Sequence, residues 1–270
     1  ELSSELAYMY AWDETVASRG SQEIVSCLVE HFRNKVSENI DHVIMFSDSC
    51  GGQNRNIKVA LMCMKFLQEE GTNIKLIDHK FMTSGHSFLP NDADFGVIES
   101  YSKGRTMNVP QDWFDAIVKS KRKKPYLLKA MRREEIYSTA NLEKAITRRR
   151  KNTVGDKVSW HKIQWLRYLK EEPYKIFYKE TLNEDFEFFA IDIAPARKGR
   201  RVAHLGLVPL ELLYSGQRPV TSAKKRDMLD LLPYIPPVKH GFFTSLIDDS
   251  GEPSVDDTPI IDRQSESESD

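Results

Sequence analysis

In the first part of the chain, the spacing of apolar residues is in turn typical of strands and of helices. This predicts strands that alternate with helices. Leu6–Trp12 is rich in aromatic and apolar residues, which is typical of a strand. From Ser21 onward, apolar residues recur about every four positions as far as Val36, the spacing of a helix that packs one face on a sheet. The run Val43–Phe46 is apolar without a break, as expected of a strand covered on both faces.

Two more helices and one more strand extend this pattern. Ile57–Leu67 has an apolar helical face and ends before Gly71. Ile74–Met82 is the next strand, and Pro90 suits the first turn of a third helix. The order strand, helix, strand, helix, strand, helix predicts an α/β fold, in which a parallel or mixed sheet carries helices on its faces.

The periods are weaker in the rest of the chain. Residues 107–151 look helical, whereas 157–193 contains aromatic alternation typical of strands, and a last helix follows Thr221 or Ser222 as its cap. We therefore expect a sheet-and-helix core at 1–106, a basic helical segment at 107–151, a smaller module of mixed α and β structure at 152–246, and a disordered acidic tail at 247–270.

Charge is distributed unevenly along the chain. The net charge is −1, but residues 248–270 hold nine acidic residues and one basic residue, so the remainder carries +7. Lys119–Lys151 contains thirteen Lys and Arg against three Glu. This favours DNA as a partner, although a solvated helix face and a nuclear-import signal are alternatives. The residues expected to contact nucleic acid are Arg55, Lys121, Arg122, Lys123, Lys124, Arg148, Arg149, Arg150 and Lys151.

The composition also indicates in which cellular compartment the chain is expected. No apolar stretch is long enough to cross a bilayer, so no membrane contact is expected. Cys27, Cys50 and Cys63 are odd in number and lack C-x-x-C spacing, which indicates a reducing compartment, nuclear or cytoplasmic. Cys50 is a candidate nucleophile, but a bystander role is more usual. Because the chain begins at Glu1, we expect it to be a piece of a longer protein.

A first candidate site lies at the end of the second predicted strand. Asp48 follows this strand, and in open α/β sheets ligands bind beyond the carboxyl ends of strands. Gly51 and Gly52 permit a sharp turn, and residues 53–56 then present hydrogen-bonding side chains at the start of a helix. The plainer interpretation is a capping aspartate in a polar loop.

A second cluster of candidates surrounds the start of the third predicted helix. Asp92 and Glu99 are seven residues apart and share a helix face, while Asp94 lies in the first turn and His86 precedes the helix. Acidic residues also favour helix N-termini for electrostatic reasons alone. Taken with Asp48, the cluster suits two Mg²⁺ or Mn²⁺ ions, which prefer oxygen ligands and stabilise both oxygens of a phosphoryl displacement.

Several motifs resemble one known family. They are Tyr10–Asp13 with Arg19–Ser21, Ser47–Asn56, Gly85–Glu99 and Pro219–Pro236. The chain is similar, as far as about Leu246, to a domain-of-unknown-function family that is abundant in insect and other invertebrate genomes and is transposon-derived. The resemblance implies a ribonuclease-H-like mixed sheet with flanking helices. It also implies a transposase-type reaction, in which metal-dependent chemistry cleaves or transfers DNA strands.

The resemblance assigns roles to the carboxylates. Asp48 matches the second carboxylate of a D-D-E/D set, and Asp92, Asp94 or Glu99 matches the third. The first is expected upstream of Glu1, with Asp13 and Glu23 as alternatives within the chain. The expected catalytic residues are therefore Asp48, Asp92, Asp94, Glu99 and His86, and the expected metal ligands are Asp48, Asp92, Asp94 and Glu99, binding Mg²⁺ or Mn²⁺.

Other functions remain open at this point. A domesticated element would bind nucleic acid or act as a scaffold without catalysis, and a homo-oligomer is compatible with either function. The D-x-D of Asp92–Asp94 also occurs in metal-dependent glycosyltransferases, but it is too short to carry much weight. Trp160, Trp165 and Tyr168 are expected in the core rather than stacked on bases.

Overall fold

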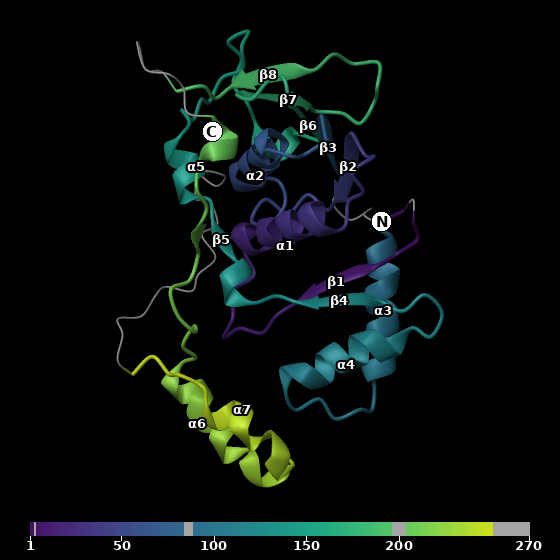
Figure 1. Cartoon of the computed structure of the whole chain (residues 1–270), viewed down its shortest axis with the longest axis vertical. Coiled ribbons are helices and arrows are strands. Elements are labelled where there is room, and N and C mark those ends of the chain that lie inside the picture. Colours follow the sequence, from purple (N-terminus) through teal and green to yellow (C-terminus); the bar gives the residue numbers. More distant parts are fainter. Residues whose placement is uncertain (3, 84–88, 196–203, 251–270) are drawn as a thin grey trace, which may run out of the picture. The chain divides into compact units, whose positions relative to one another are not determined.

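A computed structural model of the chain describes residues 1–2, 4–83, 89–195 and 204–250 (Figure 1). The contacts divide these residues into two compact units. Unit 1 comprises the described residues of 1–18, 89–136 and 214–250, and unit 2 those of 19–83, 137–195 and 204–213. Each unit is described by itself.

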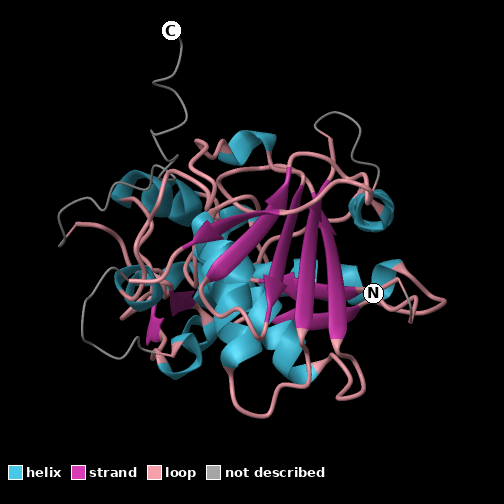
Figure 2. Cartoon of the chain, turned by 90° about the horizontal axis from the view of Figure 1, so that it is seen from above, coloured by secondary structure: helices cyan, strands magenta, loops and turns pink. Residues whose placement is uncertain are grey.

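Unit 2 contains a five-stranded mixed sheet in the order β2-β3-β6-β7-β8 (Figure 2). β2 and β3 pair in parallel, and each later neighbour pairs antiparallel. The expected mixed α/β fold with flanking helices is thus confirmed. The strands are β2 (His42–Ser47), β3 (Leu76–Phe81), β6 (Trp165–Leu169), β7 (Lys175–Lys179) and β8 (Phe189–Asp192).

The helices of unit 2 begin at caps that the sequence supplies. The N-cap of α1 is Gly20, and its N–H donates to Glu23 Oε2 at 3.0 Å. The N-cap of α2 is Asn56, whose side chain accepts the N–H groups of Lys58 and Val59. The elements are α1 (Ser21–Asn34), α2 (Ile57–Gln68), α5 (Ala140–Lys144) and the antiparallel pair β5 (Tyr137–Ser138) and β9 (Glu211–Leu212).

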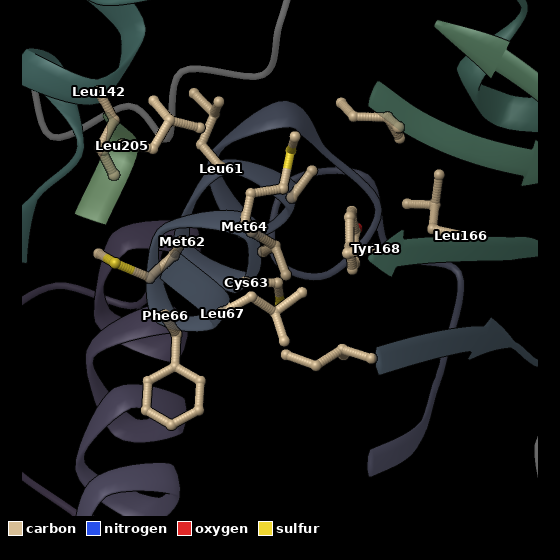
Figure 3. Packing of buried hydrophobic residues seen from close by; sticks show 14 of the residues in the cluster. Leu61, Met62, Cys63, Met64, Phe66, Leu67, Leu142, Leu166, Tyr168 and Leu205 are labelled. Carbon is tan, nitrogen blue, oxygen red and sulfur yellow. The ribbon is translucent and has the colours of Figure 1, made fainter. Parts of the chain in front are cut away.

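Helix α2 is the centre of the hydrophobic core of unit 2. It is apolar on nearly all sides, and its residues 59–67 are all buried. Figure 3 shows Leu142 and Leu205 on one side of the helix and Leu166 and Tyr168 on the other. Close packing near its end requires a glycine, because a Cβ atom on Gly206 would lie 2.1 Å from the backbone oxygen of Gln68.

Unit 1 contains a parallel two-stranded sheet and several helices. β1 (Tyr8–Ala11) pairs with β4 (Leu127–Ala130), and their small core includes Met9, Ile98 and Tyr126. The α-helices are α3 (Pro90–Ser102), α4 (Pro110–Ser120), α6 (Ser222–Asp230) and α7 (His240–Thr244). Short 3₁₀ helices in the two units are η1 (Arg133–Glu135), η2 (Trp160–Lys162), η3 (Leu205–Leu207), η4 (Leu232–Tyr234) and η5 (Pro237–Lys239).

The structure differs from the expected domain organisation. The first strand forms as predicted but pairs with β4, which lies in a segment expected to be helical. Strands β6 to β8, expected in a separate C-terminal module, instead complete the sheet that contains β2 and β3. The reason is physical: strand pairing joins residues far apart in sequence, whereas hydrophobic periods are local.

The prediction that the second strand is covered on both faces is wrong. Within the described residues, β2 pairs only with β3 and is an edge of the sheet. Val43 and Met45 pack against the core, but Ile44 and Phe46 on the other face are 48% and 46% exposed. The expected disordered tail lies outside the described residues from 251 onward. In the described part of the chain, every helix is too short or too polar to cross a membrane.

Candidate functional site

Asp48 lies where the sequence predicted it, directly after β2 at the carboxyl end of a parallel strand pair. Its Oδ1 accepts hydrogen bonds from the backbone N–H of Cys50 at 3.1 Å and from Asn54 Nδ2 at 2.6 Å. The backbone N–H groups of residues 53–55 all donate to Cys50 O, which closes the loop into a compact turn. The exposed carboxylate is therefore held in one orientation by its own loop.

A buried histidine is hydrogen-bonded to the residue that precedes this loop. Ser47 Oγ donates to Asp48 O at 2.9 Å and lies 2.8 Å from His79 Nε2. His79 is only 3% exposed, and its burial lowers the pKa of the imidazole to about 3, so the ring is neutral at physiological pH. Because the hydroxyl proton of Ser47 goes to Asp48 O, His79 Nε2 is the donor in the second hydrogen bond.

The acidic residues of α3 have mostly local partners. Asp92 caps the helix by accepting the N–H of Leu89 at 2.9 Å. Asp94 accepts hydrogen bonds from Lys121 Nζ at 3.0 Å and from the hydroxyl of Tyr126 at 2.8 Å. Burial, and then the hydrogen bond to Asp94, raise the pKa of Tyr126. Glu99 is exposed and has no side-chain partner among the described residues.

The alternatives for a first carboxylate are both engaged in local structure. Asp13 Oδ1 accepts hydrogen bonds from the N–H and the hydroxyl of Thr15, at 2.9 and 2.6 Å, and so stabilises a turn. Glu23 is 3% exposed and caps α1 through Gly20. Neither side chain is presented as a free ligand.

The carboxylates predicted as metal ligands are divided between the two units. Asp48 belongs to unit 2, and Asp92, Asp94 and Glu99 belong to unit 1. In the described ranges, no three His, Cys, Asp or Glu side chains are grouped so that they could hold a metal ion. His86 lies outside the described residues.

The first basic run, Lys121–Lys124, is divided by ion pairs. Lys121 pairs with Asp94 at 3.0 Å, and Lys124 pairs with Glu5. Arg122 and Lys123 between them are exposed and have no ionic partner among the described residues. Two adjacent positive charges therefore remain available to an external anion.

The second basic run, Arg148–Lys151, is divided in a similar way. Arg148 pairs with Glu143, and Arg149 pairs with Asp192 at 2.9 Å. Arg149 also donates to backbone oxygens of residues 192 and 194, so it serves the structure of unit 2. Arg150 and Lys151 are exposed, and no described residue neutralises them.

Arg55 is half-buried and contacts other parts of unit 2. Its Nη1 donates to Ile163 O at 3.2 Å, and the guanidinium carbon lies 5.9 Å from the centre of the Phe81 ring. Desolvation by burial lowers the pKa of Arg55, and the nearby Cys50 opposes this shift. Cys50 itself is an exposed free thiol. These contacts tie the loop after Asp48 to the start of β6.

Sequence reasoning missed a polar group of unit 2 that has several hydrogen-bond donors. Asp78 in β3 is 1% exposed. Its oxygens accept hydrogen bonds from Trp165 Nε1 at 2.6 Å, from Arg167 Nε and Nη2 at 2.8 and 3.0 Å, and from His42 Nε2 at 2.8 Å. Burial alone would raise the pKa of Asp78, but these donors outweigh it and lower the pKa. The sequence held one signal for this buried group, namely an aspartate within a predicted strand.

Comparison with known proteins adds no identification. No family model matches the chain, and no curated protein or solved structure matches it.

Proposed function

We propose that this protein binds DNA through phosphate contacts made by its two basic runs. The observation that carries this proposal is that ion pairing leaves an adjacent pair of exposed cations in each run, Arg122 with Lys123 and Arg150 with Lys151. Cations that are free of internal partners can release the counterions of a phosphate backbone. The resemblance of several motifs to a transposon-derived family supports the same class of partner.

Neutralising these pairs is expected to weaken DNA binding and its dependence on salt. Arg122→Gln/Lys123→Gln and Arg150→Gln/Lys151→Gln each remove two positive charges from the exposed surface. For every phosphate that a variant no longer binds, the slope of log K against log salt should fall by about 1. Fluorescence anisotropy with a labelled duplex, at several salt concentrations, measures this slope.

A charge-matched control separates local contacts from net charge. Lys35 and Lys103 are exposed and lie outside both basic runs, so Lys35→Gln/Lys103→Gln removes the same total charge. This control should retain nearly the wild-type affinity. An equal loss of affinity in the control and in the basic-run variants would show that general electrostatics, not these sites, governs binding.

A second function is favoured by the geometry of Asp48. This carboxylate is exposed at a strand end and its orientation is fixed by two hydrogen bonds, which suits it as one ligand of a divalent cation. We propose that, in a chain with a complete ligand set, it takes part in Mg²⁺- or Mn²⁺-dependent cleavage of DNA. The remaining ligands would be other oxygen donors of that complete set.

Replacement of Asp48 tests this second function. In a preparation that cleaves DNA with Mn²⁺, Asp48→Asn should lower the rate by about 100-fold or more, because a metal-bound carboxylate supplies several kcal/mol of charge stabilisation. The control is Asp41→Asn, an exposed aspartate before the same strand. Unchanged cleavage by Asp48→Asn would show that this residue has no catalytic role. It would not contradict the proposal that the basic runs bind DNA.

A further inference from the structure

A row of alternating aromatic and cationic side chains crosses the five-stranded sheet. The strand register places Phe46 beside Lys80, Lys80 beside Trp165, and Trp165 beside Lys179. Phe188, directly before β8, follows Lys179. The ammonium of Lys80 lies 3.8 Å from the Trp165 ring centre and 6.0 Å from that of Phe46. The ammonium of Lys179 lies 4.9 Å from Trp165 and 4.5 Å from Phe188.

This row lies on the face of the sheet opposite to the helical core. Side chains alternate between the two faces of a strand, and the neighbours of the row belong to the core that α2 covers. Those neighbours include Met45, Phe81, Leu166 and Tyr178. Phe46, at the end of the row on the edge strand β2, is 46% exposed, and Ile44 beside it is 48% exposed. An apolar patch with this exposure is typical of a surface that binds a partner.

The charges on this face favour an anionic partner. Of the basic side chains on it, Arg167 pairs with Asp78 and Lys175 pairs with Glu172. Lys179 is 3% exposed and donates to the backbone oxygens of Asn183 and Glu184, so Lys80 is the cation of the row that an external anion can reach. Asp78 is buried and saturated by its own donors, so it does not compensate Lys80. Among the residues that the structure describes, Lys80 has one acidic contact, at 3.6 Å, with Glu184, whose side chain is 79% exposed. Such an exposed pair is weak and readily exchanged for a phosphate.

We propose that the exposed β2 edge of this face binds a single strand of nucleic acid, with a base stacked on Phe46 and a backbone phosphate beside Lys80. This inference rests on the DNA-binding function proposed above and adds its own site and substrate form. A single strand exposes the flat faces of its bases, whereas a duplex hides them, and base–aromatic stacking between cations is typical of single-strand binding. Lys80 is already positioned over Trp165, so little side-chain freedom is lost on binding.

A purely apolar protein partner fits this face less well. Covering the row with an apolar surface would remove the ammonium of Lys80 from water without an added counter-charge, which is unfavourable. Phosphate groups supply that counter-charge. A protein partner, including a second copy of this chain, is therefore treated as an outcome that would overturn the proposal.

The test uses the full chain and a labelled oligothymidine of about 20 nucleotides, beside a duplex of equal length. Phe46→Ala should weaken single-strand binding by about 5-fold or more and leave duplex binding unchanged. The matched control is Phe189→Ala. Phe189 is 47% exposed but lies on the helical face, with its ring 5.6 Å from that of Tyr178. Thermal melting of each variant checks that it is folded.

Two charge variants should act in opposite directions on the same site. Lys80→Gln should weaken single-strand binding and lower the salt slope by about 1. Glu184→Gln removes the competing carboxylate of Lys80 and should strengthen binding. A folded Phe46→Ala variant that binds single strands as tightly as wild type overturns the proposal. So does self-association in wild type that Phe46→Ala abolishes while single-strand affinity is unchanged.

These outcomes are distinguishable from failure of the proposed function. If the basic-run variants lose DNA binding while Phe46→Ala and Lys80→Gln do not, the basic runs bind DNA and the β2 edge of the sheet does not. If wild type binds neither oligonucleotide at low salt, both proposals fail. Selective loss of single-strand binding in Phe46→Ala, with Phe189→Ala unaffected, supports the assignment.

Discussion

Replacing Asp78 by Ala is expected to lower the free energy of unfolding by about 3 kcal/mol. The substitution leaves the guanidinium of Arg167 and the indole N–H of Trp165 without their acceptor inside unit 2. His42 loses the same partner. A buried donor without an acceptor, next to an uncompensated charge, is among the most costly defects in a folded protein. Urea unfolding followed by circular dichroism measures the change.

The matched control is Asp41→Ala. Asp41 is 66% exposed and contacts Lys75 at 3.7 Å, so its loss should cost less than about 0.5 kcal/mol. The Asp78 contribution also has a defined pH dependence. Because the folded-state pKa of Asp78 is lowered, its stabilisation is present above the ordinary carboxyl pKa and is lost as pH falls through the lowered value. An Asp78→Ala variant as stable as wild type would contradict the role assigned to this network.

Acidification is expected to destabilise the protein through His79. The unfolded chain takes up a proton near the ordinary histidine pKa, whereas burial lowers the folded-state pKa of His79 to about 3. Between these values the unfolded state binds more protons, so stability falls as pH falls. From about pH 7.5 to about pH 5 the cost should be roughly 2 kcal/mol for this one group. Denaturant unfolding at the two pH values measures it.

His79→Phe should remove this part of the pH dependence. The ring of His79 lies 4.2 Å from that of Phe81, in surroundings that tolerate an aromatic apolar side chain. The variant loses the hydrogen bond to Ser47, which changes its stability at every pH. The quantity to compare is therefore the difference in the free energy of unfolding between the two pH values. His161→Gln, at an exposed position, should keep the wild-type difference. An equal acid-dependent loss in His79→Phe and wild type would show that other groups cause it.

The secondary structure could be predicted where the signal is local. The helices at Ser21–Asn34, Ile57–Gln68 and Pro90–Ser102 follow from apolar spacing, caps and proline position. The pairing of Tyr8–Ala11 with Leu127–Ala130 could not be predicted, because four-residue strands carry little periodicity and their partner is distant in the sequence. The same reason explains why the strands after Trp165 were assigned to a separate module.

The candidate site was predictable to a similar extent. The position of Asp48 after a strand follows from the local pattern, and the structure places it there. The partners of Asp94 and Lys121 depend on how α3 meets the segment after α4, which spacing along one helix does not reveal. The alternating row from Phe46 to Phe188 depends on the register of four strands, so no single segment of the sequence displays it.

The most direct test of the proposed function is the salt dependence of DNA binding by the unmodified chain. Equilibrium binding of a labelled duplex should be detectable at about 50 mM salt and should weaken by about 10-fold or more at about 200 mM, as expected for several phosphate contacts. Binding that is independent of salt across this range, or no binding at its lower end, would contradict the assignment of the exposed pairs Arg122–Lys123 and Arg150–Lys151 as phosphate-binding sites.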